Sequence, residues 1–154
     1  MPAFIFIDPT AKTVEPLVLP DYENETIRQV VDGRPLGFFR PAPNLLMAID
    51  DLGLMRRTQS FFCLAGYPYP FAGKALVMGM ATDGSSACLR AAGDDMLDQL
   101  VTNVRASVAF IGGINDLASA ITLGKVQQPR NYEMTRNGGR KLIWAWTPEC
   151  CTEE

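Results

Sequence analysis

The chain has 154 residues, which is the usual size of one compact domain. Hydrophobic residues make up 47% of the chain, charged residues make up 20%, and the formal net charge is −3. This composition is typical of a globular protein and excludes a strongly basic nucleic-acid binder. The chain has no histidine, which excludes Ser-His-Asp and Cys-His nucleophile systems, histidine metal sites and imidazole pH switches.

The cysteine pattern favours a reducing compartment. The four cysteines are Cys63, Cys88, Cys150 and Cys151. None of them forms a C-x-x-C pair, so the sequence predicts neither a zinc ribbon nor a thioredoxin-like redox pair. We therefore expect no metal site and no cofactor. The adjacent Cys150 and Cys151 could bind a soft metal or cross-link, but an incidental exposed pair is the favoured interpretation. We expect a cytoplasmic protein with free thiols.

No segment predicts export or membrane insertion. The apolar run Ala3 to Ile7 is too short for a signal peptide and lacks a basic segment before it. No window approaches the roughly 18–20 apolar residues of a membrane helix. We therefore expect no membrane association.

The first third of the chain predicts short strands and one brief helix. Strands are expected at Phe4 to Ile7, Lys12 to Leu19, Leu36 to Arg40, and Leu45 to Ile49. Pro16 indicates an edge position or a break in the second of these strands. The brief helix is expected at Thr26 to Asp32, where the apolar residues share one face and Gly33 ends the helix.

The next segment predicts a loop followed by a hairpin. Gly66 to Gly73 carries two prolines among aromatic residues, so we expect no regular structure there. Lys74 to Ala81 is expected to form a strand. It turns at Asp83-Gly84 toward a partner strand near Ala87 to Arg90.

The strongest predicted helix covers about residues 94–111. Its apolar side chains recur at helical spacing, at Leu97, Leu100, Val101, Val104, Val108 and Ile111. Asp94 suits the N-cap position, Asp95 complements the helix dipole, and Gly112-Gly113 end the helix.

The C-terminal part predicts a shorter helix at Asn115 to Leu123 and a hairpin around Asn137-Gly138-Gly139. A three-residue loop in that hairpin pairs Tyr132 with Trp144 and matches apolar to apolar residues. We expect Trp144 to be buried against the helix at 94–111, because that helix has the longest apolar face. The predicted fold is α+β: an antiparallel sheet of hairpins packs against this long amphipathic helix and shorter helices in one domain of residues 1–154.

Aromatic residues between Gly66 and Lys74 form the first candidate site. The segment resembles a phosphate-binding loop only faintly, because two prolines remove backbone N–H donors and a strand follows where a helix should. Tyr67, Tyr69 and Phe71 are therefore predicted to be contact residues on a surface, or a partly buried cover.

The paired acids of the sequence have structural explanations. Asp50-Asp51 precedes Leu52-Gly53 and predicts a turn after a strand, and Asp94-Asp95 is explained by helix capping. Paired carboxylates can bind metal or divide acid and base roles, but the structural interpretation is favoured at both places.

Basic residues crowd the C-terminal hairpin and form the alternative candidate site. They are Arg130, Arg136, Arg140 and Lys141, with Trp144 nearby in sequence. Arginine binds phosphates and carboxylates through two parallel hydrogen bonds, and tryptophan can stack on a base. This pattern predicts a site for an anionic, nucleotide-like ligand, although a solvated face over a tryptophan core is the favoured interpretation.

Three segments of the first ninety residues carry a resemblance to known proteins. They are Ile5 to Pro9 with the return strand at Lys12-Thr13-Val14, Asp50 to Leu54, and Pro70 to Gly79. On these segments, residues 4–90 resemble a family of bacteriophage and mobile-element proteins of unknown function. The resemblance implies a phage or plasmid origin, and hence the cytoplasm of an infected bacterium, but it implies no activity and no catalytic residue. Residues 94–154, predicted as a helix-helix-hairpin extension, lie outside the resemblance.

Two functional hypotheses follow from these observations. The first is a non-enzymatic phage accessory protein that binds a host protein, such as a component of antiviral defence, since the sequence offers no nucleophile or base and since aromatic segments suit interfaces. The alternative is a small-molecule binder that sequesters an anionic nucleotide-like ligand. An oligomer is compatible with both, and neither hypothesis involves an extended nucleic-acid surface.

Overall fold

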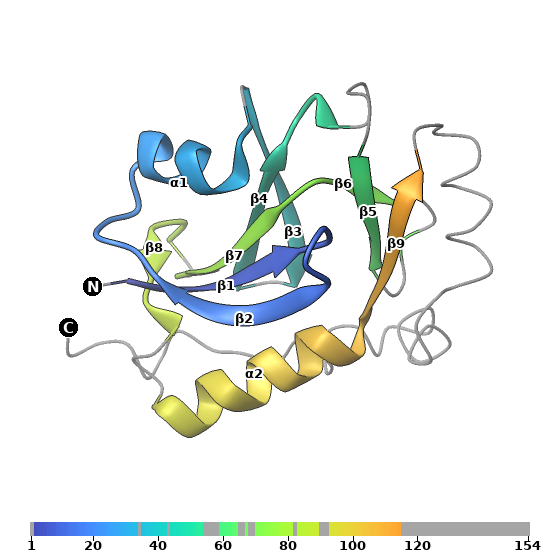
Figure 1. Ribbon diagram of the computed structural model, residues 1–154. Coiled ribbons are helices and arrows are strands. Elements are labelled where there is room, and N and C mark those ends of the chain that lie inside the picture. Colours follow the sequence, from blue (N-terminus) through green and yellow to red (C-terminus); the bar gives the residue numbers. More distant parts are fainter. Residues whose placement is uncertain are drawn as a thin grey trace.

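The computed structural model describes residues 2–33, 35–42, 44–53, 59–64, 67, 70–81, 83–89 and 93–114. These residues form mostly antiparallel strands, with two helices (Figure 1). In chain order the elements are β1 (Ala3–Asp8), β2 (Thr13–Val18), α1 (Asn24–Val31), β3 (Leu36–Ala42), β4 (Leu45–Asp50), β5 (Gln59–Leu64), β6 (Phe71–Ala72), β7 (Ala75–Met80), β8 (Ser86–Ala87), α2 (Asp94–Ala106) and β9 (Val108–Ile114). The predicted combination of antiparallel strands with helices is confirmed.

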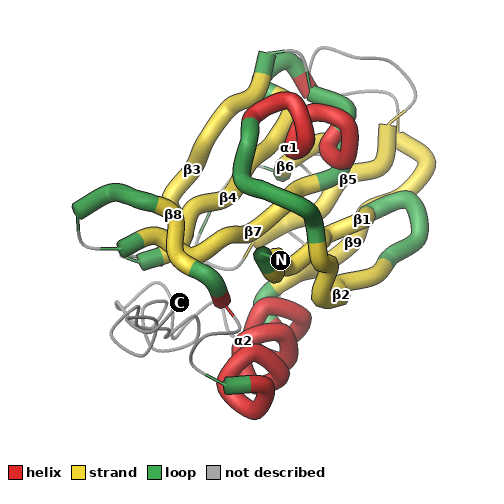
Figure 2. Tube along the Cα trace, turned by 90° about the vertical axis from the view of Figure 1, so that its left-hand side faces the viewer, coloured by secondary structure: helices red, strands yellow, loops and turns green. Residues whose placement is uncertain are grey.

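The strands form two antiparallel sheets. The large sheet has the order β2-β1-β7-β4-β3, and β8 pairs with β7 beside this path. The small sheet has the order β6-β5-β9. Figure 2 shows β3 and β2 at opposite edges of the large sheet, with β7 between them. Pro16 lies in β2, an edge strand, as its missing N–H group predicts.

Hydrophobic side chains cover both faces of the large sheet. On one face, Ile27 and Val31 of α1 pack with Phe4 and neighbouring strand residues. On the other face, the buried side of α2 lies along β2 and shares one hydrophobic core with residues of β1, β7 and the small sheet. Because both faces are covered, all six residues of β7 are buried, which explains why β1 and β7 are nearly continuous apolar runs.

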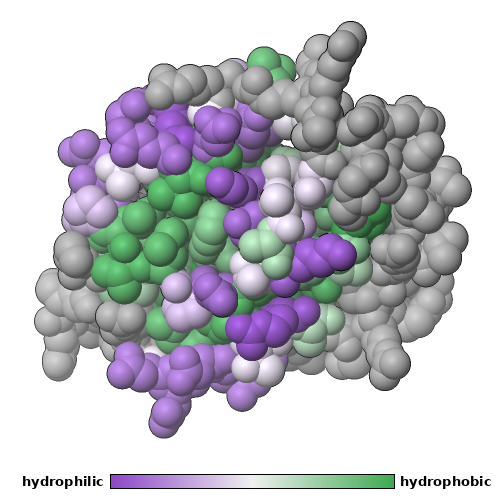
Figure 3. Space-filling model, in the orientation of Figure 1, coloured by the Kyte–Doolittle hydropathy of each residue, from purple (hydrophilic) through white to green (hydrophobic). Residues whose placement is uncertain are grey.

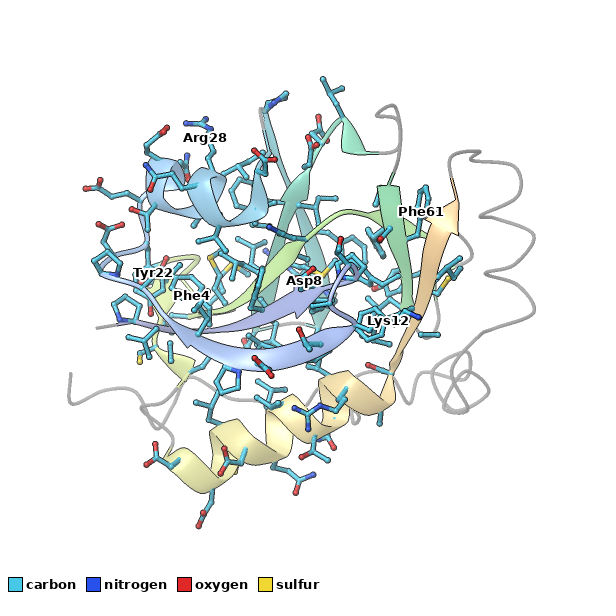
Figure 4. All side chains as sticks on the ribbon, viewed as in Figure 1. Phe4, Asp8, Lys12, Tyr22, Arg28 and Phe61 are labelled. Carbon is cyan, nitrogen blue, oxygen red and sulfur yellow. The ribbon has the colours of Figure 1, made fainter. Side chains whose placement is uncertain are left out.

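The α1 face of the sheet is not fully covered by the helix. Phe4 and Tyr22 lie against each other, with ring centroids 5.4 Å apart (Figure 4). Phe6, Leu17 and Leu46 are only partly buried on this face. In Figure 3 an apolar area lies between the hydrophilic surfaces of α1 and α2.

The end of α1 differs from the prediction. Asp32, not Gly33, is the left-handed C-cap residue, with φ 60°, and its N–H group donates to the carbonyl of Arg28 at 2.7 Å. Aspartate tolerates this conformation better than most residues. Gly33 is needed for space, because a Cβ atom there would lie 2.9 Å from the Cα atom of Asp50.

The helix predicted over 94–111 ends earlier. The predicted stripe is confirmed as far as Val104, and Leu97, Leu100, Val101 and Val104 are buried. After Ala106, the Ser107 hydroxyl donates to the carbonyl of Val104, and the chain continues as β9. Val108 and Ile111 therefore belong to a strand, whose pairing with β5 replaces the last turns of the predicted helix.

Two local expectations also need correction. Asp94 is the first residue of α2 and not its N-cap, which is Gly93 with no side-chain cap. Within the segment expected to lack regular structure, Phe71 and Ala72 form β6 and pair with β5. The turn at Asp83-Gly84 is confirmed, because β8 returns along β7.

The predictions for residues 115–154, including the second helix, the hairpin and the burial of Trp144, lie outside the described residues. Neither α1 nor α2, the two helices in the described part of the chain, is long and apolar enough to cross a membrane.

Candidate binding surface

Four aromatic side chains from separate segments meet between the two sheets. They are Phe39 of β3, Phe62 of β5, Phe71 of β6, and Tyr67, which lies between β5 and β6 in the chain. We call these four residues the aromatic cluster. The ring centroids of Phe39 and Tyr67 are 4.6 Å apart with an edge-on geometry. Phe71 lies 5.3 Å from Phe39 and 5.3 Å from Phe62, on which it stacks. These distances and tilts are those of favourable aromatic pairs.

The aromatic cluster has one fully buried member and three partly buried members. Phe62 is fully buried in the main core, whereas Phe39, Tyr67 and Phe71 are partly buried and pack against that core. The N–H group of Tyr67 donates to the carbonyl of Leu64 at 3.0 Å, which fixes the start of the loop relative to β5. The cluster therefore presents three partly buried aromatic rings that pack against the main core.

The structure brings two of the three predicted contact residues together. The rings of Tyr67 and Phe71 are 6.4 Å apart, and Tyr69 lies outside the described residues. The sequence prediction missed Phe39 and Phe62. Alternation in β3 is the signal that could have indicated Phe39, because one of two adjacent phenylalanines must point to each face of a strand.

Phe38 is the exposed member of that pair. Its side chain is 48% exposed, more than any other large hydrophobic side chain among the described residues. It pairs with Ala48 of β4, which belongs to the α1 face, whereas Phe39 pairs with Met47 on the opposite face. Aromatic side chains therefore lie on both faces of β3, with Phe38 exposed on one face and Phe39 partly buried on the other.

The turn after β4 is held by close packing, which supports the structural interpretation of its acids. The Asp50 carboxylate accepts a hydrogen bond from the N–H group of Leu52 at 3.1 Å, which closes the turn. A Cβ atom at Gly53 would lie 2.8 Å from the carbonyl oxygen of Ala72, so the turn abuts β6. The side chain of Asp51 lies over Gly37 of β3.

Two titratable groups in the described part of the chain have clearly shifted pKa values. Burial raises the pKa of the Cys63 thiol to about 11, so this thiol is protonated at neutral pH. Hydrogen bonds from the Ser85 side chain and backbone lower the pKa of Asp83, which lies in an exposed turn. No group of three or more potential metal ligands occurs among the described residues.

The alternative anionic-ligand site cannot be placed in the fold. Arg130, Arg136, Arg140, Lys141 and Trp144 all lie outside the described residues, so this site stays a prediction from the sequence.

Comparison with protein-family models, curated proteins and solved structures finds no match to this chain.

Proposed function

We propose that this chain is a non-enzymatic binding protein whose partner is a host protein, and that the aromatic cluster forms part of the contact surface. The observation that carries the proposal is the meeting of Phe39, Tyr67 and Phe71, three partly exposed rings held by strands and by the buried Phe62. Aromatic residues are enriched at the centres of protein interfaces. Rings that are already fixed in the free protein lose little conformational entropy when a partner covers them.

The choice of a host protein rests on the resemblance of residues 4–90 to bacteriophage and mobile-element proteins. A small accessory protein of such an element acts inside the infected cell, where proteins of the host, including its antiviral defences, are the available targets. The proposed location is therefore the bacterial cytoplasm.

The test starts with affinity purification of the tagged chain from bacterial cells, followed by calorimetric titration of the purified partner. Tyr67→Ala and Phe71→Ala should each weaken binding by at least about tenfold, because truncation of an interface anchor commonly costs 2 kcal/mol or more. Met96→Ala is the matched control, since Met96 is an exposed hydrophobic residue on α2, outside the aromatic cluster, and it should leave affinity unchanged.

Two results would reject the proposal. One is the absence of any partner that binds the purified chain directly. The other is a partner whose affinity is the same for the Tyr67→Ala, Phe71→Ala and Met96→Ala variants. Far-ultraviolet circular dichroism of each variant separates a lost contact from a lost fold.

A further inference from the structure

Among the described residues, strand β3 is an edge strand of the large sheet, and its outer hydrogen-bonding edge is open. The N–H group of Asp51 donates to the carbonyl of Pro35 at 3.1 Å, which fixes the alternation of the antiparallel ladder with β4. The backbone N–H and C=O groups of Gly37 and Phe39 therefore form hydrogen bonds with β4, whereas those of Leu36 and Phe38 point away from β4. Among the described residues, no strand pairs with β3 on this outer side.

The open edge carries an exposed aromatic side chain. Phe38 is 48% exposed and is the third of the seven residues of β3. Open edges with exposed hydrophobic residues readily pair with another strand, and proteins commonly protect them with charges or prolines. In β3 such protection begins only at the irregular end, where the register with β4 shifts between Phe39 and Ala42.

Charge is distributed unequally along this edge. At the Leu36 end, Asp32 is exposed and is followed by Gly33, which packs against the Leu36 side chain. At the other end, the exposed Arg40 extends toward Met80, with its Nη2 atom 3.8 Å from the sulfur. An antiparallel copy of β3 would place Arg40 of each chain at the end of the other that carries Asp32, where its guanidinium would turn from Met80 of β7 toward the edge.

We propose that two copies of this chain pair antiparallel along β3, with the twofold axis at Phe38. The two Phe38 residues then face each other, and Leu36 of each copy faces Arg40 of the other. Such an interface is self-complementary, because each copy offers the same edge, and its charges select the antiparallel direction. This inference goes beyond the proposed function and does not depend on it. Since Pro41 and the register shift limit the regular edge to a few residues, the dimer is expected to depend on protein concentration.

The first test measures the mass of the full chain by sedimentation velocity over a concentration series. The wild type should move from the monomer mass of 16.9 kDa toward twice that value. Phe38→Lys should weaken dimerisation by at least about tenfold, since it places two like charges opposite each other at the axis. Val18→Lys is the matched control, because Val18 is an exposed hydrophobic residue on the opposite edge strand, and it should dimerise like the wild type.

Charge variants test the direction of pairing. Arg40→Gln and Asp32→Asn should each weaken the dimer, and their effect should shrink at high salt. Asparagine is chosen for position 32 because it also tolerates the left-handed conformation found there.

The second test is a covalent cross-link at the axis. In a background with Cys88→Ser, Cys150→Ser and Cys151→Ser, Phe38→Cys should give a disulfide-linked dimer on mild oxidation. Facing residues of a hydrogen-bonded antiparallel pair have Cα atoms about 5.5 Å apart, within the range that a disulfide bridges. Val18→Cys in the same background should remain monomeric.

The proposal is overturned if the wild type stays monomeric at every concentration, or if Phe38→Lys dimerises as the wild type does. It is also overturned if Phe38→Cys cross-links no faster than Val18→Cys, which would indicate random collision or another register. Because Phe38→Cys changes no charge, the cross-link remains decisive even if Phe38→Lys fails to fold.

Discussion

The stacked pair of Phe62 and Phe71 should couple energetically, because it joins β5 to β6 at the point where the small sheet meets the main core. Their ring centroids are 5.3 Å apart and their planes differ by 22°. Such aromatic pairs contribute about 0.5–1.5 kcal/mol beyond the burial of their surface. In a double-mutant cycle with Phe62→Leu and Phe71→Leu, we expect a coupling energy in that range.

The single variants should differ in size. Phe62 is fully buried, whereas Phe71 is partly exposed, so Phe62→Leu removes more buried apolar area and should lower the free energy of unfolding more than Phe71→Leu. Urea unfolding followed by circular dichroism and by tyrosine and tryptophan fluorescence measures both values, and coincident transitions confirm two-state behaviour.

A second cycle supplies the control. Phe61, which Figure 4 labels, is adjacent to Phe62. It belongs to a separate buried cluster with Cys63, Ala72 and Ile111. Phe61→Leu and Phe71→Leu should therefore be additive within about 0.5 kcal/mol. Additivity in the Phe62 cycle, or equal coupling in both cycles, would refute the assignment of the stacked pair as a specific link to the core.

Three further predictions concern the supports of the fold and its buried thiol. Gly53→Ala should lower the free energy of unfolding by about 1–3 kcal/mol in urea titration, because its Cβ atom would lie 2.8 Å from the Ala72 carbonyl oxygen. Arg105→Ala should cost about 1 kcal/mol by the same assay, since its Nη2 atom donates to the Val14 carbonyl at 2.6 Å and ties α2 to β2. Burial raises the pKa of the Cys63 thiol from 9.0 to about 11, so the folded protein holds this proton more tightly than the unfolded chain does. The free energy of unfolding should therefore fall as the pH rises through that interval, and the stability present at neutral pH should be lost.

Each of these predictions has a matched comparison. Leu52→Ala, next to Gly53 but 41% exposed, and Gln99→Ala, on the exposed side of α2, should each change stability by less than about 0.5 kcal/mol. Cys63→Ala should lose less stability than the wild type between pH 9 and pH 11. Parallel pH profiles for the two proteins would contradict the assigned burial effect.

The strands of the large sheet could be predicted because their sequence patterns are local. β1 and β7 are short apolar runs, and Pro16 marks β2 as an edge strand. The end of α2 could not be found in this way. Val108 and Ile111 continue the helical spacing of the preceding residues, yet they also suit a strand, and pairing with β5 decides between the two.

The small sheet and the aromatic cluster depend on contacts that are distant in sequence. The run of β5 is short and apolar, a pattern that periodicity alone cannot assign to strand or helix. Tyr67 and Phe71 could be selected because they lie in one aromatic segment. Phe39 and Phe62 join them only through the packing of two sheets, which no local pattern encodes.

Pairing along β3 would also change what the aromatic cluster can bind. An antiparallel extension continues both faces of a sheet, so Phe39, which points opposite to Phe38, would lie on the same face in both copies. The two aromatic clusters would then flank the twofold axis on one side of the joined sheet, and a partner with two equivalent sites would gain avidity. The two proposals remain separable by experiment. Tyr67→Ala should lower partner affinity and leave dimerisation intact. Phe38→Lys should weaken dimerisation and lower only the bivalent part of the affinity.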